Sequence, residues 1–278
     1  MTWHIVADSS CDLFTLPEAN DKIDFATVPF TIRVGDTEYV DDENLSPDVM
    51  LTANEIHSEL AQTACPPPQA WMEYFSAPGP VLAFTISSNL SGSYNSACTA
   101  RNMILEEQPD KQIAVIDTKA TGPETVLIIR AACRMINEGK SIGEIEQALI
   151  DEAARTHIAF ALASYHNLIK AGRVNRLVGF IAGHLGFWGI GVGDDNGEIA
   201  IRGRARGVRG MVRFMADEIR KTGLSGPTVL ISHCFNEEGA RLLMEELRQH
   251  FHQINVEIIP TRGLDSFYAE RHGLIVAY

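Results

Sequence analysis

The 278-residue sequence contains no apolar run that approaches the roughly 20 residues needed to span a bilayer. Its first residues lack the basic segment ahead of an apolar one that a secretory signal has. Its five cysteines are scattered without a Cys-x-x-Cys pair, which argues against a disulfide framework or a zinc site. We therefore expect a cytoplasmic protein whose cysteines are small, buried or partly buried thiols.

Positive charge is also scarce. The chain has 23 Lys and Arg against 36 Asp and Glu, a formal net charge of −13 that repels polyanions, so nucleic acid is not an expected partner. Neither the Gly-x-x-x-x-Gly-Lys-Ser/Thr nucleotide loop nor the Gly-x-Ser-x-Gly nucleophile motif is present. The nine histidines are dispersed, and we expect neither a metal nor another cofactor.

One stretch departs from this acidic balance. It is an arginine cluster made of Arg202, Arg204, Arg206, Arg209 and Arg213. Two interpretations are open: a surface that binds a partner protein or a phosphate, or the solvated face of an ordinary helix.

The first half of the chain alternates between apolar runs of strand length and segments with helical spacing. Strands are predicted at 5–7, 23–32, 81–86 and 113–116, and helices at 47–54, 69–75, 124–138 and 142–154. This alternation is typical of a mostly parallel sheet with helices on both faces. Ligands of such sheets bind beyond the carboxyl ends of the strands, where the loops converge.

The pattern restarts near residue 157, so we predict an N-terminal α/β domain over residues 1–155 and a second α/β domain over residues 156–278. The second half should contain strands at 158–163, 198–201, 228–233, 256–259 and 274–278, and helices at 208–221 and 239–251. A glycine-rich stretch, 186–197, ends in Asp-Asn-Gly, which predicts a hairpin.

Five serines lie in the segment Ile86–Ala97, which follows the apolar run 81–86 and leads into a helical pattern. They therefore occupy a strand-to-helix turn, where a helix N-terminus offers unpaired N–H groups and Gly92 lets a ligand approach the backbone. A phosphate or carboxylate would fit there. The alternative is that Ser88, Ser91 and Ser93 only stabilise the turn and cap the helix.

Several motifs together resemble the DegV family of bacterial fatty-acid-binding proteins. They are Asp8-Ser9-Ser10-Cys11-Asp12-Leu13, Val28-Pro29-Phe30, Tyr39-x-Asp41, the Thr63 to Pro66 segment, Ser87 to Ala97, Val115-Ile116-Asp117-Thr118 and Ala171-Gly172-Arg173. Their order and approximate spacing match the family along nearly the whole chain.

The resemblance implies a two-domain α/β protein that holds one long-chain fatty acid in a buried apolar tunnel. Its carboxylate would lie near the domain interface and be presented to a separate fatty acid kinase. The protein would then be a non-catalytic carrier, and transient contact with a membrane could serve lipid exchange. Apolar residues of the second half are candidates for the tunnel wall: Phe160, Leu162, Leu168, Ile169, Leu177, Val178, Phe180, Ile181, Leu185, Phe187 and Trp188.

The same resemblance assigns residues to the carboxylate. The family's Thr-Ser-Gln-Pro motif falls on Thr63 to Pro66, so the Thr63 hydroxyl becomes a hydrogen-bond donor, and Ser91 with the Gly92 N–H become its partners. Ser88 and Ser93, in the same serine-rich segment, are further candidates.

Two arginines also match the family's pattern. Arg206 matches the surface that contacts the kinase. Arg173 matches a Gly-Arg pair for which a structural salt bridge and a ligand contact are both open.

The sequence departs from the family at three places. Ala64 and Cys65 replace two polar residues of the threonine motif. Where many relatives carry a carboxylate-binding histidine, Tyr268 stands here and His272 follows four residues later. The stretch from Phe187 to Gly193 replaces a Lys-Pro segment and is a candidate lining of the tail pocket.

An enzyme is the alternative class: a phosphotransferase or hydrolase acting on a small anionic substrate at the turn from Ser87 to Ser93. Ser91 could then be the nucleophile, although no histidine is visibly paired with it.

Overall fold

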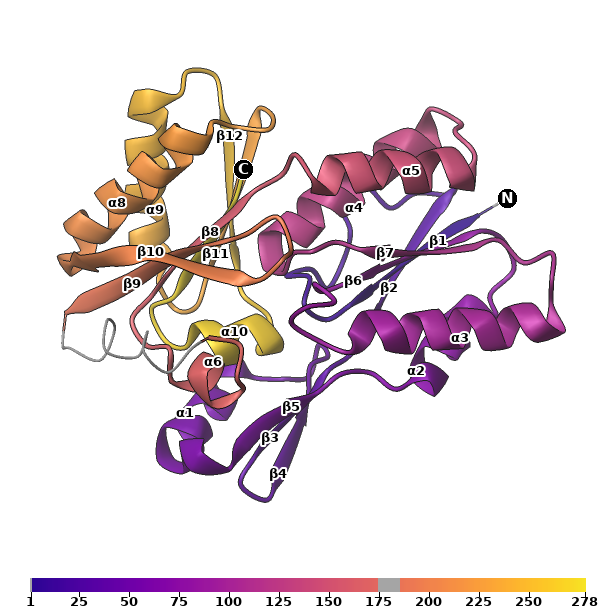
Figure 1. Ribbon diagram of the computed structural model, residues 1–278, viewed down its shortest axis with the longest axis horizontal. Helices are drawn as coiled ribbons and strands as arrows, with labels where there is room; N and C mark the ends of the chain where they lie inside the picture. The colour runs from indigo at the N-terminus through magenta and orange to yellow at the C-terminus, as the bar shows by residue number, and fades with distance from the viewer. Residues whose placement is uncertain (1, 175–185) are drawn as a thin grey trace.

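The computed structural model describes residues 2–174 and 186–278. Two large sheets lie side by side, and a small third sheet lies below their junction in the view of Figure 1. Among the described residues, no helix is both long enough and apolar enough to cross a membrane. The division near residue 155 stays a prediction; it falls between α5 (Ile142–Ala153) and β8 (Ile158–Leu162).

The first large sheet is entirely parallel, as predicted. Its order is β2 (Ile23–Val28), β1 (Trp3–Asp8), β6 (Val81–Thr85) and β7 (Ile113–Asp117). Side chains of successive strand residues point to opposite faces of the sheet, so each strand contributes residues to two hydrophobic cores. One core lies under α4 (Gly122–Asn137) and α5, and the other lies under α2 (Pro68–Phe75) and α3 (Ser93–Glu107).

The single strand expected at 23–32 is in fact two strands. Pro29 interrupts it because proline has no N–H to give to a sheet, and β3 (Thr31–Val34) continues into a different sheet. There β3 pairs antiparallel with β4 (Thr37–Val40) and β5 (Ala61–Ala64). Thr63 lies within β5, opposite Ile32 of β3.

The second large sheet has six strands and is mostly antiparallel. Its order is β10 (Ile199–Arg206), β9 (Phe187–Gly193), β8, β13 (Leu274–Ala277), β11 (Thr228–His233) and β12 (Asn255–Pro260). The hairpin predicted at Asp-Asn-Gly is confirmed, because β9 and β10 pair antiparallel across it. Since β10 continues to Arg206, Arg202, Arg204 and Arg206 lie on a strand, and the helix-face interpretation is wrong for these three.

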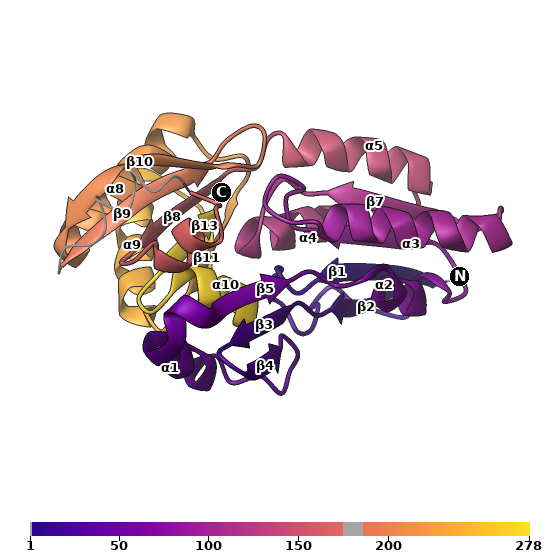
Figure 2. The same ribbon diagram turned by 60° about the horizontal axis from the view of Figure 1, so that its bottom comes forward.

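The two faces of the second sheet are covered by different parts of the chain. Helices α8 (Gly207–Thr222) and α9 (Glu237–His250) cover one face. The other face packs against α6 (His166–Lys170), α10 (Gly263–Ala269), and the first-half elements β3 and α1 (Pro47–His57). Figure 2 shows the small sheet and α1 reaching beneath the second sheet. The halves are thus interleaved along the chain.

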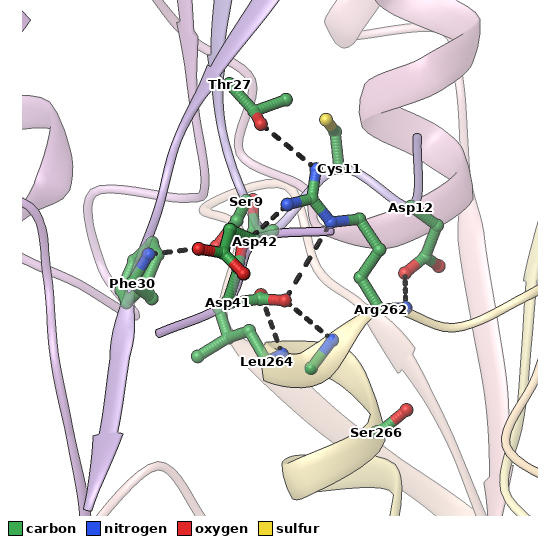
Figure 3. A network of polar contacts seen from close by, with 12 residues as sticks. Ser9, Cys11, Asp12, Thr27, Phe30, Asp41, Asp42, Arg262, Leu264 and Ser266 are labelled. Atoms are coloured by element: carbon green, nitrogen blue, oxygen red, sulfur yellow. Dashed lines mark hydrogen bonds and ion pairs between the residues drawn. The ribbon is translucent and has the colours of Figure 1, made fainter. Parts of the chain in front are cut away.

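A buried arginine joins these elements at the start of α10 (Figure 3). The guanidinium of Arg262, 2% exposed, donates to the carbonyl oxygens of Leu13 and Asp41, both at 2.6 Å, and to the Thr27 hydroxyl at 3.2 Å. The Asp41 carboxylate in turn accepts the backbone N–H groups of Gly263 and Leu264 at 2.8 and 2.9 Å. One side chain of the second half thereby holds three segments of the first.

We expect Arg262→Met to lower the free energy of unfolding by about 3–5 kcal/mol, because it leaves buried acceptors and a buried carboxylate without their cation. Urea unfolding measures this loss. Arg248→Met, on the exposed end of α9, is the matched control and should change stability by less than about 0.5 kcal/mol. Equal stability of the two variants would contradict the assignment.

Candidate functional site

The serine-rich turn connects β6 to α3, and two of its serines are held by carboxylates of the sheet. The Ser88 hydroxyl donates to Asp117 Oδ2 at 2.6 Å, and its N–H donates to Asp117 Oδ1 at 3.0 Å. The Ser93 hydroxyl donates to Asp8 Oδ2 at 2.6 Å. Neither serine lines the cavity described below. Their geometry favours the turn-stabilising interpretation.

Asp8 is fully buried and accepts several of the hydrogen bonds that hold the turn. It also accepts the Ser10 hydroxyl at 2.5 Å and the Ile86 N–H at 3.0 Å. Burial raises the pKa of Asp8, while these donors and Ser93 act in the opposite direction. The turn is therefore fixed to the end of β1.

The other predicted residues meet around one cavity of about 350 Å³, which we call the polar cavity. Thr63 from β5, Ser91 and Gly92 from the turn, and Tyr268 from α10 all line it. The hydroxyls of Thr63 and Tyr268 lie 2.7 Å apart, close enough for a hydrogen bond in which either is the donor. Residues separated by 205 positions in the chain thus share one site.

Tyr268 and His272 were the two alternatives for the C-terminal contact, and the structure places Tyr268 in the cavity lining. His272 has a φ of 73° and lies in the turn before β13, where its backbone N–H donates to the Cys234 carbonyl. Burial raises the pKa of Tyr268, whereas the Thr63 hydroxyl and the Arg173 charge lower it. The balance lies above the usual value, so Tyr268 is a neutral phenol at physiological pH.

Arg173 also lines the polar cavity. Its Nε donates to the Leu90 carbonyl, and its Nη1 donates to the Ala171 carbonyl at 2.9 Å. Neither acceptor is a carboxylate, so these two bonds orient the guanidinium without neutralising it. The arrangement favours the ligand-contact interpretation over the structural salt bridge.

The departure at Ala64 and Cys65 lies in the same cavity, because both residues line it. A Cβ on Gly92 would lie 3.5 Å from Cys65 Sγ, so the thiol packs directly against the start of α3. Burial raises the pKa of Cys65, which keeps the thiol protonated. The family's two polar residues are thus replaced here by a methyl group and a neutral thiol.

A second cavity adjoins the first and is lined almost wholly by apolar groups; we call it the apolar cavity. The two cavities share six residues, Leu90, Thr121, Leu168, Ile199, Asp265 and Tyr268. Phe160, Leu162 and Leu168, predicted as tunnel residues, line the apolar cavity. Ile169, Phe187 and Trp188 do not line it, and Leu177, Val178, Phe180, Ile181 and Leu185 lie outside the described residues.

Asp265 is a residue that sequence reasoning missed. It lines both cavities, and its Oδ1 accepts the Thr121 hydroxyl at 2.8 Å. Its Oδ2 and Asp12 Oδ2 are buried, unpartnered within the described part of the chain, and both within 3.0 Å of the point where a Cβ on Gly122 would lie. Burial raises the pKa of Asp265 well above its usual value, and nearby Asp12 raises it further.

Arg206 lies away from both cavities, at the end of β10, where its side chain is exposed. Its guanidinium carbon lies 5.9 Å from the centre of the Phe187 ring, and that of Arg204 lies 5.4 Å from the same ring. The arginine cluster lies outside the linings of both cavities.

The chain matches known proteins over nearly its whole length. The family model described as "Uncharacterised protein, DegV family" matches residues 2–269. A DegV domain-containing protein of Streptococcus pneumoniae is 36% identical over 278 residues, which is 100% of this chain and 99% of the relative.

Two solved structures are similar throughout. The Streptococcus pneumoniae fatty acid kinase (Fak) B3 protein loaded with linoleic acid has a TM-score of 0.96 and 36% identity, covering 100% of this chain and 99% of that one. A DegV family protein from Eubacterium eligens loaded with heptadecanoic acid has a TM-score of 0.94 and 34% identity, covering 99% of each chain. The two-domain α/β architecture is therefore shared with both.

The buried acids predict a pH dependence of stability. Burial raises the pKa of Asp12 to about 7, and that of Asp265 well above its usual range, so the folded protein binds more protons than the unfolded chain above pH ~4. The free energy of unfolding should therefore fall as pH rises from about 5 to 8. For Asp265→Asn, which keeps an acceptor for the Thr121 hydroxyl, the free energy of unfolding should fall less steeply with pH.

Urea unfolding at several pH values between 5 and 8 measures these slopes. Asp110→Asn, at an exposed position, is the control and should run parallel to the natural sequence. If the curve for Asp265→Asn also runs parallel to that of the natural sequence, Asp265 does not bind an additional proton in the folded state.

Proposed function

Because the chain belongs to the DegV family, we propose that it binds one long-chain fatty acid. The carboxylate occupies the polar cavity, and the hydrocarbon tail occupies the apolar cavity. The observation that carries this proposal is the direct junction of the two: a cavity lined by hydroxyl groups and by Arg173 opens into an almost wholly apolar one. Similar proteins loaded with linoleic and heptadecanoic acids support it.

The head of the ligand is bound by neutral donors. Thr63 and Tyr268 hydrogen-bond to each other, and one of the two hydroxyls can turn its proton to a carboxylate oxygen. Ser91 and the Gly92 N–H approach from the start of α3, where the helix N-terminus favours an anion. Charge-assisted hydrogen bonds of this kind contribute about 1.5–3 kcal/mol each, and Arg173 supplies the countercharge.

The tail needs no polar contact. Burying an alkyl chain contributes about 0.8 kcal/mol per methylene, so the apolar cavity favours a ligand with a long saturated or unsaturated chain. Phe160, Leu162 and Ile275 supply the wall from the second sheet, and Leu168 supplies it from α6.

The protein itself acts as a carrier and performs no chemistry on the acid. Among the described residues that line the polar cavity there is no histidine to act as a general base for Ser91. The acid is presented instead to a separate fatty acid kinase, and the name of the similar Fak B3 protein supports a partner of this kind. Arg206 is our candidate for the contact surface, because it is exposed and lies away from both cavities. Cytoplasmic localisation and lipid exchange at a membrane stay predictions.

The direct test is to denature the purified protein, extract it with organic solvent and identify the extract by mass spectrometry. About one fatty acid per chain supports the proposal. An empty extract, combined with no binding of added fatty acid and turnover of a phosphate or ester substrate, would overturn it in favour of the enzyme alternative.

Thr63→Val should weaken fatty acid binding by about 10- to 100-fold, because it removes one charge-assisted hydrogen bond while preserving shape. Displacement of a fluorescent fatty acid measures the affinity. Thr99→Val, at an exposed position of α3, is the control and should bind as the natural sequence does. Unchanged affinity for Thr63→Val would remove Thr63 from the site.

Arg206→Glu should leave fatty acid binding intact and slow acyl phosphate formation by a fatty acid kinase about tenfold or more, because it reverses a charge in the contact surface. The rate is measured with a fatty acid kinase that phosphorylates the acid bound to the unmodified protein. Arg248→Glu, on α9, controls for net charge. Equal rates for all three proteins would contradict the assignment of Arg206.

A further inference from the structure

We propose that Ile158 closes the tail end of the apolar cavity and so sets the longest unbranched acyl chain that this protein retains. The inference rests on the proposed function and specifies the class of fatty acid that the site accepts.

The apolar cavity follows one strand. Ile158, Phe160 and Leu162 occupy alternate positions of β8, so they share a face of the second sheet, and all three line the cavity. At about 3.3 Å per residue, the first and last of them are separated by roughly 13 Å along the strand. The cavity therefore extends along β8 past these three residues.

The two ends of this row differ in what lies beside them. Just beyond Leu162, the Ser164 hydroxyl donates to Glu270 Oε1 at 2.8 Å, which ties this end of β8 to the C-terminus of α10 and hence to Tyr268. Ile158 lies at the opposite end, opposite Ala277 of β13. The carboxylate end is thus near Leu162, and the methyl end of the ligand is near Ile158.

A third cavity, of about 600 Å³, lies beyond Ile158. Its lining includes five acidic residues, Asp117, Glu124, Glu146, Asp194 and Asp195. It shares three residues with the apolar cavity: Lys119, Ile158 and Gly193. The lining of this third cavity mixes these acids with apolar side chains such as Ile116 and Ile150, so a hydrocarbon tail that entered it would lie against polar groups and gain less free energy from burial than in the apolar cavity. The boundary between the two cavities is therefore a boundary for the ligand.

Ile158 is the apolar part of that boundary. A Cβ on Gly193 would lie only 2.7 Å from Ile158 Cγ2, so the isoleucine lies directly against the bare backbone of β9. Lys119 completes the wall, with its Nζ donating to the Asp195 carbonyl at 3.3 Å. Gly193 leaves room for the side chain, and Ile158 fills the end of the cavity.

Ile158→Ala tests the role of this side chain. It should raise the affinity for a 20-carbon acid relative to a 16-carbon acid by about tenfold, because the vacated volume buries two or more further methylenes. Competition with straight-chain acids of 14 to 22 carbons measures the ratio. Ile190→Ala, which removes the same volume from the opposite, α8-covered face of the sheet, is the matched control and should leave the ratio unchanged.

The outcomes separate the two proposals. If the natural sequence binds no acid of any length, the proposed function fails. If it binds, and Ile158→Ala keeps the natural ratio or shifts it no more than Ile190→Ala does, the inference about Ile158 is overturned while the proposed function stands. Should Ile158→Ala fail to fold, Ile158→Val removes one methylene and must shift the ratio in the same direction by a smaller factor.

Discussion

The guanidinium of Arg262, in the second half of the chain, bonds to three segments of the first half. Four buried aspartates, Asp8, Asp12, Asp41 and Asp265, surround the junction, and Arg262 is the buried cation among them. Because it bonds to segments of the first half from the start of α10, it also fixes the helix that carries Tyr268. The polar cavity is therefore assembled around a buried polar network, in which Arg262 and hydrogen-bond donors oppose the rise in pKa that burial causes in these carboxyls.

Local patterns predicted the elements but only part of the site. The parallel sheet follows from apolar runs that alternate with helices, and the β9–β10 hairpin follows from Asp-Asn-Gly. The sequence pattern did not predict the break at Pro29, although proline lacks the N–H that a strand needs. It therefore did not predict the small sheet, in which Thr63 lies on β5. The extension of β10 to Arg206 depends on pairing with β9, which no local pattern specifies.

Within the serine turn, the sequence could not distinguish the serine that lines the polar cavity, Ser91, from Ser88 and Ser93, which bond to carboxylates of the sheet. Ser88 and Ser93 donate to Asp117 and Asp8, which come from strands 29 and 85 residues away, whereas the Ser91 hydroxyl accepts the nearby Ser93 N–H at 3.3 Å. Asp265 was missed for the same reason, since its partner Thr121 is 144 residues distant. Resemblance to a family identified Thr63, Ser91 and Tyr268 as neighbours, which composition and periodicity alone would not have done.

The interleaving of the halves has a consequence for how the chain folds. The small sheet and α1 are complete in sequence by residue 64, yet their apolar faces pack against β8, α10 and β13, which follow about 95 to 215 residues later. These early segments cannot bury their apolar surface while the chain is being synthesised, and their contacts are of high sequence separation. The last strand thus completes a core that the first sixty residues began, and the apolar cavity, which Ile275 of β13 lines, forms only when this strand is in place.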